Sequence, residues 1–457
     1  MTKKLFSTTD MTVGTPWKSI LSFTLPMLIG NIAQQLYSTV DSIVVGRYIG
    51  DNALAAVGSA VPLINMLLVL FIGISSGAGI MVSQYFGAKN REKLSWTIGN
   101  CITLTMMACV LLIVMALPFI RPILRVLNTP ESIMDWCADY LNISLIGVAG
   151  MAYYNILSGI IRGMGDSVSA LLYLLVATVI NIVLDIYFVA VLDMGVGGVA
   201  LATVIAQLVS SALCLIKLSK MRDDFDFSIK YMKPKSSYIK TTIRLGLPTG
   251  LTQAIFSSAM IIVQSLTNCF GELFIAANVV IMRVDGFAMM PNFSFGMALT
   301  TYAGQNVGAG LYDRVTKGAK DGTLMAVICS TTITLLILLF GKFLMGIFTE
   351  TRELVDMSYY LMKILAAGYI AVAITQSLSG IMRGAGDTLT PMWISLITTV
   401  VARVPIAYGI SFLTRTASLP YGRCECIQIS LLVSWVLGAL LTAIFYKIGK
   451  WKNKRLN

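Results

Sequence analysis

Long apolar runs without a charged side chain alternate with short polar or glycine-containing turns along the whole chain. Four of these runs, at 97–120, 194–216, 245–271 and 427–446, each reach or exceed the roughly 20 residues that an α-helix needs to cross a bilayer. The pattern therefore predicts an all-α polytopic membrane protein. Reading the apolar runs against the turn signals gives about twelve transmembrane helices, near 18–46, 52–82, 95–118, 134–160, 168–190, 197–218, 242–270, 275–303, 318–340, 356–381, 390–413 and 424–446.

One string of residues occurs twice. LSGIIRGMGDS at 157–167 returns as LSGIMRGAGDT at 378–388, which is an offset of 378 − 157 = 221 residues. The Gln-x-x-Gly turn of residues 84–87 returns at the same offset as residues 305–308. Several motifs that share one offset indicate two copies of one structural unit.

The repeat predicts how the chain is divided. We expect an N-terminal six-helix lobe at 1–220, a charged cytoplasmic linker at 221–240 and a C-terminal six-helix lobe at 241–457. Six helices is an even number, so the second copy enters the membrane in the same orientation as the first. The lobes should then be related by a pseudo-twofold axis along the membrane normal, an arrangement that suits alternating access in transporters.

Charge supports the membrane assignment and predicts the topology. Charged residues are only 12% of the chain and apolar residues are 56%, whereas soluble domains carry about 25% charged residues. The formal charge of +12 is concentrated at both termini, in the linker and in alternate loops. This asymmetry follows the positive-inside rule and places both termini in the cytoplasm of a multi-pass plasma (inner) membrane protein. It argues against nucleic acid as a partner.

The sequence offers little support for a metal centre or for an enzyme. The eight cysteines are scattered, and the chain has no histidine, so a zinc site at Cys424 and Cys426 is not expected. The repeated RGxGD turns could cradle phosphate, but no Lys-Ser/Thr pair follows them as in a P-loop. We favour a tight re-entry turn in which Asp166 and Asp387 cap the next helices. No catalytic residue is assigned.

Intramembrane carboxylates are the strongest functional signal. An ionisable residue at bilayer depth costs roughly 2.5–3.5 kcal/mol on insertion scales and usually lines a polar cavity or an ion path. Asn181 and Asp185 lie at i and i+4 on one helix, and Thr203 follows the GVGG turn on the next helix. Together with Asp41 they form a set of oxygen donors suited to Na⁺ or to proton exchange. We assign Asp41, Asn181, Asp185 and Thr203 to cation coupling.

The repeat provides a test of that assignment. At an offset of 221, Asn181 and Asp185 correspond to Ala402 and Ile406, and Asp41 corresponds to Ile262, or to Val263 at 222. The acids are therefore not duplicated with the scaffold. This favours a coupling-ion site in the N-terminal lobe over a structural polar cluster, which remains the alternative.

Substrate contacts and a hinge are more weakly indicated. Asp285 follows Arg283, and either an interhelical ion pair or a role in substrate binding would explain it. Pro26 removes a backbone hydrogen bond in the helix that carries Asp41 and is expected to bend it; either a hinge or a kink of the shared fold, repeated at Pro248, would explain it. We assign the following residues to substrate binding: Gln34, Tyr37, Gln253, Arg283, Asp285 and Met289.

Taken with the two RGxGD turns, the runs LPMLIGNIAQQLYSTVDSIVVGRYIG and RVDGFAMMPNFSFGMALTTYAGQNVGAG resemble the multidrug and toxic compound extrusion (MATE) family. The resemblance implies two six-helix bundles forming a V. It also implies export of cationic amphipathic compounds, coupled to inward flow of Na⁺ or H⁺, with no other cofactor. Asp41, Asn181, Asp185 and Thr203 match a cation-site pattern found in part of that family.

The chain departs from another branch of the family, which has acids in its seventh and tenth helices. In this chain, residues 245–270 of the seventh helix and 358–382 of the tenth contain no acid, which favours the N-terminal lobe as the cation site. The expected partners are cationic small molecules and membrane lipid, and we expect a monomer. The main alternative is a flippase for a lipid-linked or polyprenyl precursor, which would use Arg283, Arg403 and Lys363 to face phosphate.

Overall fold

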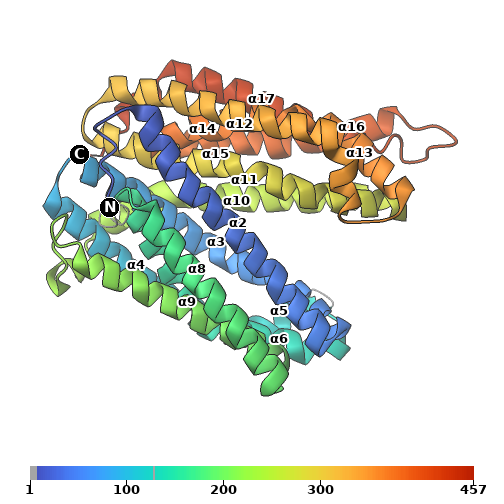
Figure 1. Cartoon of the computed structure of the whole chain (residues 1–457), viewed down its shortest axis with the longest axis horizontal. Coiled ribbons are helices and arrows are strands. Elements are labelled where there is room, and N and C mark those ends of the chain that lie inside the picture. The colour runs from blue at the N-terminus through green and yellow to red at the C-terminus, as the bar shows by residue number, and fades with distance from the viewer. Residues whose placement is uncertain (1–7, 127–128, 457) are drawn as a thin grey trace. The chain divides into compact units, whose positions relative to one another are not determined.

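The computed structural model describes residues 8–126 and 129–456, and it is helical almost throughout (Figure 1). Within these ranges the side chains of residues 37, 38, 40–42, 51, 54 and 55 are not described. The one β-bridge recorded in the described part of the chain joins Thr416 and Leu419. The prediction of an all-α protein is therefore confirmed.

The described residues of the first repeat form eight α-helices. Their bounds are α2 (Pro16–Val44), α3 (Asp51–Gly87), α4 (Arg91–Ala116), α5 (Ile120–Val126), α6 (Glu131–Ile146), α7 (Val148–Gly163), α8 (Ser167–Ile186) and α9 (Gly195–Lys220). A 3₁₀ turn, η2 (Leu117–Phe119), links α4 to α5, and two π turns, η1 (Val45–Ile49) and η3 (Tyr187–Val191), extend α2 and α8. The linker runs from Met221 to Lys235 and contains the 3₁₀ turn η4 (Ile229–Met232).

The second repeat follows the same order. Its helices are α10 (Ser236–Thr267), α11 (Glu272–Gly308), α12 (Tyr312–Gly346), α13 (Arg352–Ala366), α14 (Gly368–Gly384), α15 (Leu389–Leu396), α16 (Arg403–Leu413) and α17 (Cys426–Ile448). The short turns are η5 (Asn268–Phe270), η6 (Ile397–Ala402) and η7 (Lys450–Asn453), of which η6 is a π turn. Helix α10 begins six residues earlier than the expected residue 242, so the linker is shorter than predicted.

Nine of the described helices are long and apolar enough to cross a membrane, and two bent helix pairs bring the number to eleven. The twelfth expected span falls on α2, a helix of 29 residues, some of whose side chains lie outside the described set. The bent pairs are α6 with α7, at 49°, and α13 with α14, at 45°. Each was expected as one continuous helix.

The breaks occur at Gly147 in the first repeat and at Ala367, next to Gly368, in the second repeat, and the two glycines are 221 residues apart. A Cβ atom at Gly147 would collide with Val204, and one at Gly368 would collide with Trp435. The broken helix therefore lies against a neighbouring side chain at a distance that only glycine permits. Glycine also weakens a helix by about 1 kcal/mol relative to alanine. In both repeats the bend therefore falls at or next to the glycine.

The repeated string near residue 157 is a packing motif. Its glycines at 159 and 163 face Ser75 and Gly79 of α3, too close for a Cβ atom to fit without a shift. In the second repeat, the glycines at 380 and 384 approach the carbonyl groups of Gly296 and Thr300 on α11 in the same way. Pairs of small residues four apart allow membrane helices to approach backbone to backbone.

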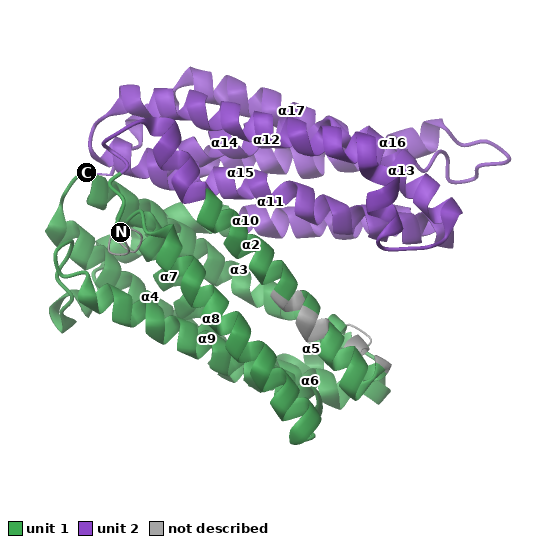
Figure 2. Ribbon diagram, in the orientation of Figure 1, with its two compact units in different colours: residues 1–10, 25–250 green, residues 11–24, 251–457 purple. Residues whose placement is uncertain are grey.

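The described chain divides into two compact units (Figure 2). Unit 1 contains residues 8–10 and 25–250, and unit 2 contains residues 11–24 and 251–456. Helices α2 and α10 each pass from one unit into the other, close to Pro26 and Pro248. The division into lobes at 220 and 241 stays a prediction, because the units place 11–24 with the second repeat and 241–250 with the first.

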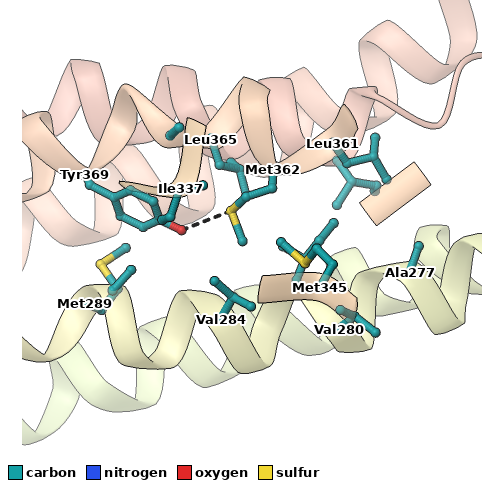
Figure 3. Packing of buried hydrophobic residues seen from close by; sticks show 14 of the residues in the cluster. Ala277, Val280, Val284, Met289, Ile337, Met345, Leu361, Met362, Leu365 and Tyr369 are labelled. Carbon is teal, nitrogen blue, oxygen red and sulfur yellow. Dashed lines mark hydrogen bonds between the residues drawn. The ribbon is translucent and has the colours of Figure 1, made fainter. Parts of the chain in front are cut away.

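Each unit has its own apolar core. In unit 1 the core gathers residues of α3, α6 and α9, among them Ala56, Cys137 and Val199. In unit 2 it gathers residues of α11, α13 and α14 (Figure 3), where Met362 and Tyr369 lie opposite Val284 and Met289. These cores fix the helices that carry the polar groups described next.

Candidate functional site

Three of the four predicted cation-coupling residues lie together inside unit 1. Asn181 and Asp185 occupy successive turns of α8 and are both fully buried, and Thr203 on α9 is 7% exposed. The Asn181 amide Nδ2 lies 3.3 Å from Thr203 Oγ1. The sequence therefore brings a carboxylate, an amide and a hydroxyl into the interior at the junction of two helices.

The turn before α8 is held by Asp166. Its carboxylate accepts hydrogen bonds from Ser169 N at 2.9 Å and from Ser169 Oγ at 2.7 Å, which caps the helix. Lys217 Nζ on α9 lies 3.0 Å from Asp166 Oδ2, and the Asp166 side chain is 1% exposed. This ion pair joins the start of α8 to the end of α9, so the expected capping role of Asp166 is observed.

At the far end, the connection between α8 and α9 differs in detail from the expected GVGG turn. The turn itself is formed by residues 192–194, and GVGG is the first turn of α9. Asp193 and Gly195 both have positive φ, at 52° and 58°. The π turn η3 directly follows Ile186, and π turns are often found beside functional sites.

The other predicted residues of the N-terminal lobe lie on α2. The side chains of Asp41 and Tyr37 lie outside the described residues, so their part in the cluster is not described. Gln34 is exposed on α2. Pro26 lies inside the same helix.

The unit 1 cluster has the chemistry of an ion or proton site. Carboxylate, amide and hydroxyl oxygens are the ligands that hard cations prefer. A buried carboxylate charge is costly without a partner, and a bound cation or a bound proton would compensate it. The described residues contain no group of three or more His, Cys, Asp or Glu side chains that could hold a metal ion, so a transition-metal site is not indicated there.

Unit 2 contains a cavity of about 440 Å³ lined by α10, α11, α14, η6 and α17. Three of the predicted substrate residues line it, namely Gln253, Asp285 and Met289. Arg283 is exposed and does not line this cavity. The structure therefore separates Arg283 from Asp285, in agreement with their i, i+2 spacing on α11.

Asp285 is held by a tyrosine that the sequence did not single out. The Tyr369 hydroxyl donates a hydrogen bond to Asp285 Oδ1 at 2.9 Å. It also lies 3.3 Å from the sulfur of Met362, as Figure 3 shows. Tyr369 is fully buried and is the second residue of α14, which begins at Gly368 directly after the break. Asp285 also experiences Coulombic attraction from Arg403, which lines the same cavity.

The position of Arg403 corrects the alignment of the two repeats. Asp166 and Asp387 are 221 residues apart, but the π turn η6 precedes Arg403, and a π turn accommodates one extra residue. Beyond it the offset is therefore 222, and Asn181 corresponds to Arg403 (181 + 222 = 403). Asp185 then corresponds to the buried Ala407, not to Ile406 as an offset of 221 predicted.

Comparison with known proteins agrees with this internal alignment. A family model described as MatE matches residues 26–187 and again residues 248–409. Both pairs of limits differ by 222, since 248 − 26 = 222 and 409 − 187 = 222. The fold and the site thus define a multi-pass membrane transporter that is built from two copies of one unit, and not an enzyme.

The chain belongs to the MatE family of multidrug and toxic compound extrusion transporters. It is similar to the probable multidrug resistance protein YoeA of Bacillus subtilis, with 30% identity over 447 residues that cover 96% of this chain and 95% of the relative. YpnP of the same organism is 27% identical, and the match covers 98% of both chains. The fold matches the outward-facing structure of a MATE family transporter with a TM-score of 0.90, 23% identity, and 98% and 99% of the two chains covered.

Proposed function

We propose that the protein is a secondary active antiporter that exports cationic amphipathic compounds in exchange for Na⁺ or H⁺ by alternating access. The observation that carries this proposal is the buried unit 1 cluster of Asn181, Asp185 and Thr203. A carboxylate in a membrane-spanning helix costs free energy. Its presence therefore points to a function that an apolar residue could not perform. The second repeat has an alanine at the position of Asp185, so the shared fold does not require the acid.

Binding of the coupling ion would act through the charge of Asp185. A cation or proton neutralises the carboxylate, and its release restores the charge inside an apolar bundle. Ion binding and substrate binding can then each favour a different conformation of the transporter. Asp41 is assigned to the same site, and Pro26 to the hinge of the helix that carries it.

The substrate class is inferred from two supports. Relatives of this chain are named as multidrug resistance and multidrug export proteins, and the unit 2 cavity has flexible and aromatic walls suited to varied ligands. The residues proposed to contact substrates are Gln34, Tyr37, Gln253, Arg283, Asp285 and Met289. The proposed protein is a monomer in the plasma (inner) membrane, with lipid around it and both termini in the cytoplasm.

Proteoliposomes that contain the purified protein would test the coupling. Uptake of a cationic dye is measured under a Na⁺ gradient alone and under a pH gradient alone, for the wild type and for the variants Asp185→Asn and Asp41→Asn. We expect one gradient to drive transport in the wild type and neither to drive it in the variants. Asp135→Asn is the matched control, because Asp135 is exposed and pairs with Arg121 at the surface. Unchanged coupling in both variants would exclude the unit 1 site.

One observation favours a second candidate, the flippase for a lipid-linked or polyprenyl precursor. Arg403 lines the unit 2 cavity, and a guanidinium group binds phosphate well. Asp285 in the same cavity opposes a phosphate group, which is why antiport ranks first. Transfer of a fluorescently labelled lipid phosphate across the proteoliposome membrane, without dye transport, would reverse that order.

A further inference from the structure

We propose that the unit 2 cavity binds zwitterionic amphipathic ligands, with Asp285 facing the cationic group and Arg403 facing the anionic group. This inference rests on the proposed function in one respect, because it names a substrate class for a transporter. It concerns binding alone, however, and it can be tested in the absence of any ion gradient.

The first support is the pair of charges in the cavity. Asp285 on α11 and Arg403 at the start of α16 both line it and attract each other. Nevertheless they form no direct ion pair, since the ion pairs found among the described residues lie elsewhere. Separated charges in a low-dielectric interior are costly unless a partner compensates them. A ligand with one charge of each sign would compensate both.

The second support is a buried donor and a buried acceptor that remain unused. Within the described part of the chain, Arg403 Nε and Gln428 Oε1 are both buried without a hydrogen-bond partner. Gln428 is fixed by its other amide atom, which donates to Asn278 Oδ1 at 3.3 Å. Nearly all buried polar atoms in proteins are hydrogen-bonded. An orphan donor and an orphan acceptor that line one cavity therefore point to a ligand with both kinds of group.

Hydrogen bonds hold the Asp285 carboxylate and the backbone of Arg403. Asp285 accepts the Tyr369 hydroxyl at 2.9 Å. Arg403 directly follows the π turn, and its backbone N–H bonds to the Thr398 carbonyl, which also accepts Ser434 Oγ from α17 at 2.9 Å. A carboxylate that is already oriented loses little entropy when a ligand binds.

The walls of the cavity fit the apolar part of an amphipathic ligand. Phe256, Phe293 and Trp435 contribute aromatic surface, and Met282 and Met289 contribute thioethers. The volume of about 440 Å³ lies within the range of roughly 300–1,000 Å³ for small-molecule pockets. A purely cationic ligand would be attracted by Asp285 and repelled by Arg403, so the cavity gives it little electrostatic preference.

A matched pair of dyes tests the proposal. Rhodamine B carries a carboxylate and a delocalised cation, and its ethyl ester has the same ring system without the carboxylate charge. Binding of each dye to the purified protein in detergent is followed by fluorescence anisotropy. We expect wild-type protein to bind rhodamine B more tightly than the ester.

Variants then assign each charge. Arg403→Gln should weaken rhodamine B binding by about tenfold or more, because a charged hydrogen bond is lost, and should not weaken binding of the ester. Asp285→Asn should weaken the binding of both dyes. Arg415→Gln, at an exposed loop residue, is the control and should leave both affinities unchanged.

Several results would overturn the proposal. One is equal wild-type affinity for the two dyes, which requires no variant and therefore does not depend on how well Arg403→Gln folds. Another is equal weakening of both dyes by Arg403→Gln. Tighter binding of a lipid phosphate that survives Asp285→Asn would instead assign the cavity to the flippase. Asp185→Asn, which should abolish coupling, should keep the preference for rhodamine B, so failure of the antiport proposal is recognised separately.

Discussion

Equivalent positions in the two repeats carry opposite chemistry. In unit 1, α8 presents Asn181 and Asp185, a polar pair that can take up a mobile cation. In unit 2, the matching positions are Arg403 and Ala407, so the guanidinium group is a cation that is covalently attached and cannot leave. If the antiport proposal holds, the duplicated helices provide one place with an exchangeable positive charge and one with a permanent positive charge. A repeated scaffold would then divide the proposed tasks of ion coupling and ligand binding between its copies.

The largest expected effect comes from the acid of unit 1. Asp185→Asn should lower ion-driven dye transport at least about tenfold, since neutralising the carboxylate removes the differential binding on which coupling depends. The measurement is dye uptake into proteoliposomes with and without the driving gradient. Asp285→Asn, the carboxylate of unit 2, should alter the affinity for the dye and keep the dependence on the gradient. If both variants lost that dependence equally, the division of tasks would be wrong.

A smaller effect is expected from the Lys217–Asp166 ion pair, which has no counterpart among the described side chains of the second repeat. Lys217→Met leaves the buried Asp166 carboxylate without its cation, which should lower the free energy of unfolding by about 3 kcal/mol. Asp387, the equivalent acid, is bound by Thr390 Oγ1 at 2.8 Å, and among the described side chains it has no ion pair. A thiol-reactive fluorogenic dye can follow thermal unfolding, because Cys101, Cys109, Cys137 and Cys214 of unit 1 are all buried.

Asp166→Asn combined with Lys217→Met is the informative control. It removes both charges together, so it should recover much of the lost stability. A double variant no more stable than Lys217→Met would show that the lysine acts through packing alone.

The glycines of the repeated string should differ in the same assay. A Cβ atom at Gly384 would overlap the Thr300 backbone carbonyl, whereas one at Gly163 would be tight against Gly79 and Val82. We expect Gly384→Ala to cost about 2–3 kcal/mol and Gly163→Ala about 1 kcal/mol, as for overpacked cores. Gly409→Ala is the control, because nothing lies within 4 Å of its added carbon. The reverse order would indicate that the first repeat packs more tightly.

The smallest effect is expected at the surface of the linker. A hydrogen bond from Arg91 lowers the pKa of the Asp226 carboxyl. The Arg91 side chain is 47% exposed and the Asp226 side chain is 48% exposed. A lowered carboxyl pKa stabilises the fold above the usual value near 4 and loses that contribution as the pH falls through the lowered value. Because the pair is solvated, Asp226→Asn should leave the melting temperature at neutral pH unchanged within error. A clear drop there would show that the linker anchors unit 1 more firmly than its exposure indicates.

The sequence predicted those features that depend on local pattern. Apolar runs located the spans, the repeated string located two equivalent turns, and the i, i+4 spacing placed Asn181 and Asp185 on one buried face of α8. It did not predict the breaks at Gly147 and beside Gly368, because the apolar run continues through them and each glycine lies against a side chain of another helix.

The role of Arg403 was missed for a related reason. The offset of 221 taken from the turns placed Ala402 opposite Asn181, and a single extra residue in the π turn η6 changed the register. A π turn leaves no mark in the composition of the chain. Tyr369 was missed because its hydroxyl meets Asp285 across 84 positions of sequence.

The N-terminal segment has a consequence for the chain as a whole. Arg314 on α12 donates to the backbone carbonyls of Met11, Val13 and Gly14, and Gln305 accepts the Met11 N–H at 2.9 Å. Residues 11–24 are therefore an integral piece of unit 2, while the start of α10 belongs to unit 1. A cut at the linker would not yield two self-sufficient halves, since each fragment would lack a segment that lies on the other. Two separately expressed halves would have to exchange those segments in order to complete both units.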